Sequence, residues 1–271
     1  MNSKVTIILS AYNGAQWIKK SIESALQQTF TDFQLMVIND CSIDNTEDVV
    51  LGMMKEDPRI IYLRNDQNLG LAKTLNVGLG LASGRYIARL DQDDEWIDVD
   101  KLKKQVAFLD AHPQYVMVGT GAVVVDEKGK EITRYLMPKT DSKIRRKILR
   151  MNCFIHTSVV FRKDAVKNLG GYRSHKMSED HDLWLRLGRV GKFANMPEYS
   201  VRYLLGLSGL NSQNRILRLK QNMLFAREHK DFYPNYLQAV ILGWAKLIFL
   251  PVFSVLPSKV KGFFLNLHKK I

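Results

Sequence analysis

The sequence predicts an α/β fold in which a mostly parallel sheet is flanked by helices. Three observations support this expectation. Apolar, strand-like runs alternate with helix-like segments over the first hundred residues, the connections are short, and a polar cluster follows several of the runs. Such alternation is typical of parallel sheets covered on both faces. Because ligands of these sheets bind beyond the carboxyl ends of the strands, the polar clusters indicate where a site is expected.

The elements of this first region follow from their residue patterns. Continuous runs of Val, Ile and Leu are typical of strands that are buried on both faces, whereas apolar residues at helical spacing indicate amphipathic helices. The expected strands are residues 5–9, 33–38, 59–63 and 85–90, and the expected helices are residues 16–28, 46–54 and 71–81.

The second hundred residues are less regular. A helix is expected over residues 102–109, ending before Pro113, and a second helix is marked by Leu183, Leu187 and Val190. Strands are expected over residues 115–125, 130–135 and 158–161.

Composition narrows the class of protein. The chain has 271 residues, of which 46% are hydrophobic, so it can bury a full core. Its two cysteines provide no disulfide framework, and the sequence opens without a recognisable secretory signal, so a cytoplasmic location is expected. The formal net charge is +13, and from residue 201 onward eleven Lys and Arg face two acidic residues, a balance of 11 − 2 = +9.

The most informative motif is Asp91-Gln92-Asp93-Asp94, directly after an apolar run. Three carboxylates in four residues repel one another, which favours a bound divalent cation. Magnesium-type cations use one or two carboxylates together with water and substrate phosphates, so the motif also predicts a phosphate-bearing substrate. The alternative is a solvated acidic turn before the helix that starts near Asp98.

Five motifs occur in a fixed order along residues 4–205. They are Ser10-Ala11-Tyr12-Asn13, residues 39–46 beginning with Asn39-Asp40, residues 68–76 including Lys73, Leu90-Asp91-Gln92-Asp93-Asp94, and Gly170-Gly171-Tyr172 followed by Glu179-Asp180-His181-Asp182-Leu183-Trp184. Taken together, this order resembles the inverting glycosyltransferases of family 2, which have the GT-A fold.

The resemblance implies a reaction and a division of roles. The substrates would be a nucleotide-diphosphate sugar donor and a saccharide acceptor, with a Mg²⁺ or Mn²⁺ cofactor. Such a transfer needs a base for the attacking hydroxyl and positive charge for the departing diphosphate. By the family's pattern, Asp180 is the base, Asp93 binds the metal, Asp91 lies near the ribose, Ala11, Tyr12 and Asp40 hold the nucleotide base, and Asn13 and Lys73 belong to the same donor-binding set.

The chain departs from the family at two positions. Ser10 stands where the family usually has Pro. Many members also carry an Arg-x-His segment after the base, but here Arg202 is followed by Tyr203 and Leu204. Either Arg202 and neighbouring basic residues replace the His, or metal binding is weaker.

Several of these residues also have plain structural interpretations. Asp44 is expected to be a turn or helix-capping residue, and Tyr12 could pack beside the sheet. His156 is interpreted as a hydrogen-bonded structural histidine, with an acceptor-site role as the alternative. Trp184 is expected in the core, and Trp96 is either core or a platform for an acceptor sugar.

Two other functions remain open for the chain as a whole. One is a nucleotidyltransferase, which also uses acidic metal ligands. The other is a non-catalytic, sugar-nucleotide-binding membrane subunit.

The C-terminal region has a different character from the rest of the chain. Residues 1–210 are expected to form the catalytic domain and residues 211–271 a helical, amphipathic appendage. Residues 237–256 contain twelve Leu, Ile, Val and Phe, worth roughly −3.6 to −7.2 kcal/mol on the membrane-insertion scale, against about +2.5 to +3.5 kcal/mol for Lys246.

Charge decides how this region is interpreted. One membrane span would place the terminal lysines (Lys259, Lys261, Lys269 and Lys270) outside, against the positive-inside tendency. We therefore expect peripheral binding to the inner leaflet at the cytoplasmic face of the membrane, with a saccharide or lipid-linked acceptor. A soluble helical subdomain is the alternative. No nucleic-acid partner is expected, because the lysines accompany leucine and phenylalanine.

Overall fold

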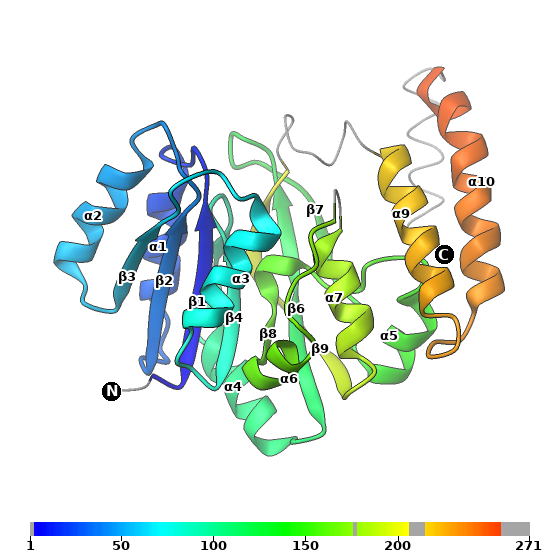
Figure 1. The fold of residues 1–271 in the computed structure, drawn as a ribbon, viewed down its shortest axis with the longest axis horizontal. Helices are drawn as coiled ribbons and strands as arrows, with labels where there is room; N and C mark the ends of the chain where they lie inside the picture. The colour runs from blue at the N-terminus through cyan, green and yellow to red at the C-terminus, as the bar shows by residue number, and fades with distance from the viewer. Residues whose placement is uncertain (1–2, 176–177, 206–214, 256–271) are drawn as a thin grey trace.

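The computed structural model describes residues 3–175, 178–205 and 215–255, and its centre is one mixed sheet (Figure 1). The strand order is β3-β2-β1-β4-β8-β6-β9-β5, and β7 pairs with β6. Strands β3, β2, β1 and β4 are all parallel, as expected from the alternating region. Strand β8 runs antiparallel to β4 and β6, so it joins this parallel half to the second half of the sheet.

The strands and the helices, each in chain order, have the following bounds. The strands are β1 (Val5–Ala11), β2 (Phe33–Asn39), β3 (Ile60–Arg64), β4 (Tyr86–Asp91), β5 (Glu95–Trp96), β6 (Tyr115–Val125), β7 (Glu131–Tyr135), β8 (Val160–Arg162) and β9 (Lys192–Leu204). The helices are α1 (Ile18–Leu26), α2 (Thr46–Glu56), α3 (Leu71–Leu81), α4 (Lys101–Ala111), α5 (Asp141–Lys147), the 3₁₀ turn η1 (His156–Ser158), α6 (Lys163–Asn168), α7 (Glu179–Leu187), α9 (Arg215–Glu228) and α10 (Tyr236–Val255).

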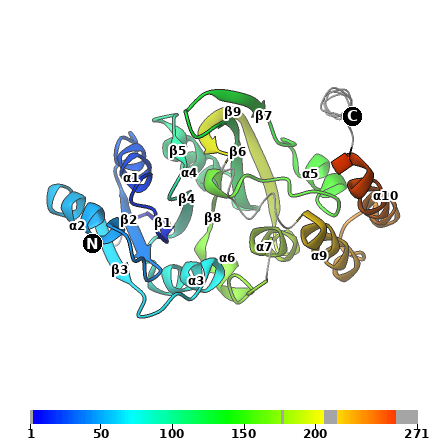
Figure 2. The ribbon, with the colours of Figure 1, turned by 90° about the horizontal axis from the view of Figure 1, so that it is seen from above.

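The alternating pleat of the strands builds two cores, one on each face of the sheet. In β1, Ile7 and Leu9 pack with α1, α2 and α4, whereas Ile8 between them packs with α3 and α7. Seen from above, α1 and α4 lie on one side of the strands and α3 and α6 on the other (Figure 2). Burial on both faces explains why these strands are continuous apolar runs.

The expectation of a mostly parallel first half is confirmed, but the second half differs from the sequence-based assignment. Strand β9 has 13 residues and includes Pro197, so its pattern does not indicate a strand. It forms because it pairs in parallel with β6, with register shifts along the way, and its end pairs with β5. Helix α7 begins at Glu179, one turn earlier than its apolar pattern suggests.

The C-terminal helices pack against the rest of the described chain. Phe225, Tyr233 and Ala239 are buried in the same core cluster as Trp184 of α7. Figure 1 shows α10 at the end of the molecule remote from α2. Among the described residues, no helix combines the length and apolar character needed to cross a bilayer. The expected domain boundary at 210/211 and the four terminal lysines lie outside the described residues.

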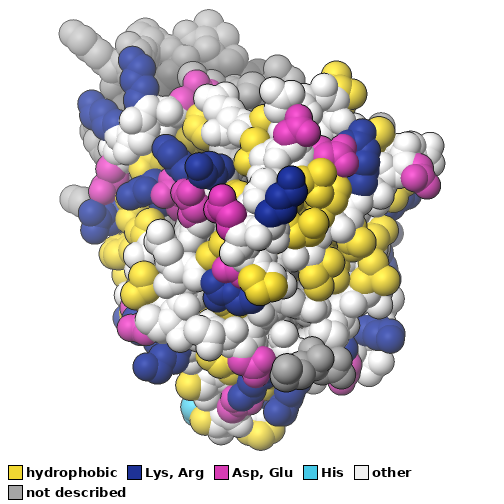
Figure 3. Space-filling view, turned by 90° about the vertical axis from the view of Figure 1, so that its left-hand side faces the viewer, with side chains coloured by type: hydrophobic (Ala, Val, Ile, Leu, Met, Phe, Trp, Pro, Cys, Tyr) yellow, Lys and Arg dark blue, Asp and Glu magenta, His cyan; other side chains and the backbone are white. Residues whose placement is uncertain are grey.

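At the end of the molecule opposite α10, the basic side chains that the structure describes do not gather into a patch (Figure 3). Figure 3 faces the side formed by α2 and β3, where basic and acidic side chains are interspersed. This side therefore presents no extended surface of one sign.

Candidate active site

The polar clusters predicted to share one edge of the sheet do so. Strand β1 pairs Ser10 with Asp91 of β4 and Ala11 with Asn39 of β2. The residues that follow these three strands therefore emerge side by side. Ala11 itself is buried, and its carbonyl accepts a hydrogen bond from Asp40 N over 2.7 Å.

The loop after β1 is held in place by its neighbours. The Gln92 side chain bonds both Tyr12 N and Tyr12 O, at 2.9 and 3.1 Å, so it fixes the Tyr12 backbone. Asn13 has a φ of 49°, and its backbone and side chain are bonded to Ser42 and Ile43 of the next loop. Tyr12 is 46% exposed, so its ring is free of the core and available to a ligand.

Asp40 is buried and supports the loop that precedes α3. Its carboxylate accepts hydrogen bonds from Asn65 Nδ2, Leu69 N and Gly70 N at 2.8–2.9 Å. Burial would raise the pKa of Asp40, but these hydrogen bonds outweigh it and lower the pKa below its usual value. Asp40 is therefore a fixed anion beside the Tyr12 loop.

Two other residues of these loops have clearer local roles. Asp44 accepts from Thr46 N and Ala15 N, which makes it a turn residue that joins the first two loops. Lys73 is exposed on α3 and forms no ion pair with any residue that the structure describes. Its amine is therefore available, but it is not fixed toward the acidic turn.

The acidic turn after β4 is a concentration of poorly compensated negative charge. Burial and the charge of Asp91 raise the pKa of Asp93 to about 6, and burial with both neighbouring charges raises that of Asp94 well above its usual value. Asp94 Oδ1 accepts from Leu204 N, while its buried Oδ2 has no hydrogen-bond partner among the described residues. Clustered carboxylates of this kind supply oxygen donors that fit a Mg²⁺ or Mn²⁺ ion.

A cleft of about 360 Å³ opens beside this turn. It is lined by Asp93 and Glu95, by Lys20 and by Lys128 from the β6–β7 turn. Arg202 also lines the cleft and pairs with Glu95 at 2.7 Å. A cationic group thus stands near Asp93 in the segment where the family's His is missing.

A buried arginine connects the acidic turn to the second half of the site. Arg89 is fully buried, with Nη2 2.6 Å from Asp91 Oδ1 and Nε 3.2 Å from His156 Nε2. Tyr172 Oη lies 2.9 Å from the same imidazole nitrogen. Arg89, His156 and Tyr172, here called the Arg89 cluster, thus extend from the end of β4 to the Gly-Gly-Tyr motif.

Asp180 lies at the start of α7, where its charge acts on His156 and Tyr172 of this cluster. Its Oδ2 accepts from Asn152 Nδ2 at 2.5 Å, and Asn152 Oδ1 in turn accepts from Phe154 N, so the carboxylate is held in a fixed orientation. Burial and the charge of Asp180 raise the pKa of its neighbour Glu179 to about 7. Asp180 remains partly exposed. A fixed, accessible carboxylate of this kind can accept a proton.

Trp184 and Trp96 are both core residues. Trp184 is fully buried. Trp96 is 3% exposed and donates from Nε1 to Thr157 O at 2.9 Å, which excludes the alternative that it forms a platform for an acceptor sugar.

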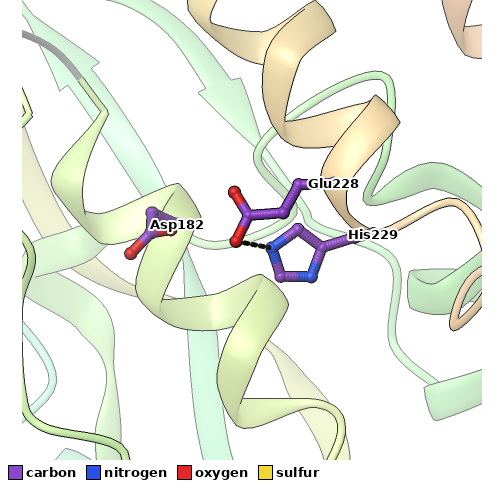
Figure 4. A group of neighbouring side chains, drawn as sticks. All are labelled: Asp182, Glu228 and His229. Atoms are coloured by element: carbon purple, nitrogen blue, oxygen red, sulfur yellow. Dashed lines mark ion pairs between the residues drawn. The ribbon is translucent and has the colours of Figure 1, made fainter.

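A second group of possible metal ligands, Asp182, Glu228 and His229, lies at the contact between α7 and α9 (Figure 4). Asp182 pairs with Arg186 at 2.7 Å, and Arg173 lies 3.0 Å from Glu228 and 3.5 Å from Asp182. His229 Nδ1 is 3.0 Å from an Arg189 nitrogen. Three guanidinium groups thus surround two carboxylates, so a dication would meet net positive charge. This group is an ion-pair network that ties α9 to α7.

Sequence reasoning passed over Arg89, Asn152 and the hydrogen-bonding role of Gln92. Arg89 carried a detectable signal, because an arginine inside a strand buried on both faces needs buried partners. Asn152 carried none, since its partner Asp180 is 28 residues away.

Comparison with known proteins identifies the family to which the chain belongs. The sequence model of glycosyl transferase family 2 matches residues 6–170, more than half of the chain. The amylovoran biosynthesis glycosyltransferase AmsE of Erwinia amylovora is 30% identical over 211 residues, which cover 77% of this chain and 79% of AmsE. The chain therefore belongs to glycosyl transferase family 2, and it is a glycosyltransferase.

Two further proteins bear on fold and chemistry. WfaP of Escherichia coli, a UDP-Glc:α-D-GlcNAc-diphosphoundecaprenol β-1,3-glucosyltransferase, is 29% identical over 219 residues, 79% of this chain and 83% of WfaP. The mannosyltransferase PcManGT of Pyrobaculum calidifontis, solved with GDP-Man and Mn²⁺, superposes with a TM-score of 0.69 at 18% identity over 91% of this chain and 70% of PcManGT. The fold is GT-A.

Proposed function

We propose that the chain is a metal-dependent, inverting glycosyltransferase that moves a sugar from a nucleotide-diphosphate donor to a lipid-linked saccharide in cell-surface polysaccharide synthesis. The observation that carries the proposal is that the acidic turn is joined to His156 through Arg89, while the charges of both Asp91 and Asp180 act on His156. The names of AmsE and WfaP support the pathway and the lipid-linked acceptor, and the ligands of PcManGT support the donor class and the divalent metal.

The proposed chemistry is a single displacement. The acceptor hydroxyl attacks the anomeric carbon and passes its proton to Asp180, while the electron pair of the carbon–oxygen bond leaves with the nucleotide diphosphate. Attack from the face opposite the leaving group inverts the configuration. Asp93, with Asp91 and Asp94 beside it, would hold the Mg²⁺ or Mn²⁺ ion, which supplies positive charge to the departing diphosphate. Tyr12, Asn13 and Asp40, with Ala11 and Lys73, would bind the donor.

We also propose that the chain works at the cytoplasmic face of the membrane through its C-terminal part, residues 211–271. On α10, Leu237, Ile241, Trp244 and Ile248 recur at helical spacing and are 56–73% exposed. These four residues, here called the α10 stripe, form an apolar face without a partner among the described residues. The basic residues of this part of the chain favour anionic headgroups as the surface that covers it.

Donor binding is the first test. Calorimetric titration of UDP, GDP and their sugars, with and without Mn²⁺, should identify one nucleotide family whose binding depends on the metal. Asp93→Asn should remove that dependence because a carboxylate ligand is lost. Asp164→Asn, an exposed carboxylate on α6, is the matched control. Binding by no nucleotide, with the protein shown to be folded, would refute the proposal.

Turnover with lipid-linked acceptors is the second test. Asp180→Asn should retain donor binding but lose roughly 10²–10⁴-fold in kcat, the usual contribution of a positioned base. The anomeric configuration of the product, read by NMR, should be opposite to that of the donor. A wild-type chain that binds donor without transferring sugar to any acceptor would instead be a non-catalytic binding subunit.

A further inference from the structure

His156 lies in a short turn that is anchored next to the acidic turn. Its neighbour Thr157 is fully buried in η1, with Oγ1 3.1 Å from Asp91 N and its carbonyl 2.9 Å from Trp96 Nε1. Because both bonds hold the same residue, the position of the His156 backbone relative to the end of β4 is fixed.

The imidazole of His156 is also fixed, by contacts with the other side of the site. Its ring packs edge-on against Trp184 with a centroid separation of 5.9 Å, and against Tyr172 at 5.7 Å. Trp184 lies four residues after Asp180, on the same face of α7. The charges of Asp91 and Asp180 both act on the imidazole, which therefore stands between the acidic turn, contacted through Arg89, and the proposed base.

The hydrogen bonds of the imidazole define its tautomer. A guanidinium group can only donate, so Nε2, 3.2 Å from Arg89 Nε, must be an acceptor and carry no proton. Burial and the charge of Arg89 lower the pKa of His156 to about 4, so the ring is neutral near pH 7 and its single proton is on Nδ1. Nδ1 has no hydrogen-bond partner in the part of the chain that the structure describes, and His156 is partly exposed.

We infer that the Nδ1–H group of His156 donates a hydrogen bond to a hydroxyl oxygen of the sugar that is transferred. This inference rests on the proposed function, in which Asp91 marks the ribose side of the donor and Asp180 meets the acceptor hydroxyl. A group between them faces the ring of the transferred sugar. Asp91 and Asp180 can only accept from sugar hydroxyls and Arg89 is fully buried, so the Nδ1–H group supplies a fixed neutral donor that the two carboxylates lack.

The test compares binding of a nucleotide sugar with binding of its nucleotide diphosphate. Calorimetry with Mn²⁺ would use UDP against UDP-glucose and UDP-GlcNAc, and GDP against GDP-mannose, on the full chain. His156→Leu should leave the Kd of the diphosphate within about 2-fold and weaken the Kd of the nucleotide sugar about 10-fold, the loss expected for one hydrogen bond. His156→Asn, which keeps an N–H near the Nδ1 position, should recover most of that affinity.

The matched control is His112→Leu, because His112 lies at the end of α4, where its Nδ1 bonds to Phe108 O and its carbonyl accepts from Arg162 Nη2. This variant should bind both ligands as wild type does. Equal weakening of diphosphate and nucleotide sugar in His156→Leu would overturn the inference, as would unchanged binding of both. If the wild type binds no nucleotide at all, the proposed function fails, and the inference fails with it.

Discussion

Glu179 lies beside Asp180 in the first turn of α7, where burial and the charge of Asp180 raise the pKa of Glu179 to about 7. In the unfolded chain a glutamate titrates near its usual value of about 4.3. The folded state therefore holds this proton more tightly than the unfolded state. It follows that the contribution of Glu179 to stability is favourable at low pH and is lost as the pH rises from about 4.3 through 7.

This linkage predicts how Glu179→Gln depends on pH. The neutral amide avoids the penalty of ionising Glu179, so the variant should be more stable than wild type at pH 8, by about 1–2 kcal/mol after allowance for partial exposure. At pH 5 the two proteins should differ little. Thermal unfolding between pH 5 and 8 measures the difference, with the exposed Glu56→Gln on α2 as control. A difference that is independent of pH would contradict the argument.

At the scale of the element, α3 packs unusually close to the sheet at one glycine. A Cβ on Gly78 would lie 2.7 Å from Ile38 Cδ1 and 2.9 Å from Ile8 Cγ2, both in buried strands. A Cβ on Gly80, two residues further along the same helix, would meet nothing within 4 Å. Substituting each of the two glycines therefore distinguishes the effect of close packing from the effect of helix propensity within one helix.

The two alanine substitutions should shift stability in opposite directions. Gly78→Ala should destabilise by about 1–2 kcal/mol, because overpacking a buried contact outweighs the gain in helix propensity. Gly80→Ala should stabilise by roughly 0.5–1 kcal/mol, because it gains propensity without a clash. Urea unfolding of both variants, compared at equal m-values, gives the two numbers. Stabilisation by Gly78→Ala would mean that α3 can move away from Ile8 and Ile38.

At the scale of the whole molecule, α9 and α10 place an apolar face at the end remote from α2 (Figure 1). These helices are fixed to the catalytic part by the buried Phe225 and Tyr233 and by the Arg173–Glu228 ion pair. A surface held by the α10 stripe would therefore keep a constant orientation relative to the acidic turn and Asp180. A lipid-linked acceptor would then approach the site from the surface on which the protein rests.

Replacing the α10 stripe by serines should abolish binding to vesicles. Each exposed apolar side chain is expected to contribute about 1.5 kcal/mol or more on burial, so the loss of four removes most of the affinity. Flotation with phosphatidylglycerol vesicles should recover wild type but not the variant, and phosphatidylcholine vesicles should recover less of both. Leu81→Ser on α3 with Val190→Ser in the turn after α7, both exposed apolar residues, is the control. Equal flotation of the wild type and the stripe variant would refute this surface.

Local patterns were sufficient for the first half of the fold and for the choice of candidate site residues. Continuous apolar runs identified β1, β2 and β4, because strands buried on both faces need no long-range information to be recognised, and the shorter apolar run of the edge strand β3 was also found. The polar residues that follow those runs in the sequence predicted the positions of the acidic turn and the Tyr12 loop. The same reasoning could not find β9, whose strand conformation depends on pairing with β6 some 75 residues earlier in the chain.

The sequence by itself determined the α/β class, the sheet edge at which the polar clusters lie, the family and the candidate residues Asp91, Asp93 and Asp180. Only the tertiary structure decided how those carboxylates are held, because their partners are distant in sequence. Asn152 donates to Asp180 across 28 residues, Asp91 N donates to Thr157 across 66, and Arg89, which pairs with Asp91, bonds His156 across 67. Residue type sets what a side chain can do, whereas burial and long-range contacts set its charge and orientation.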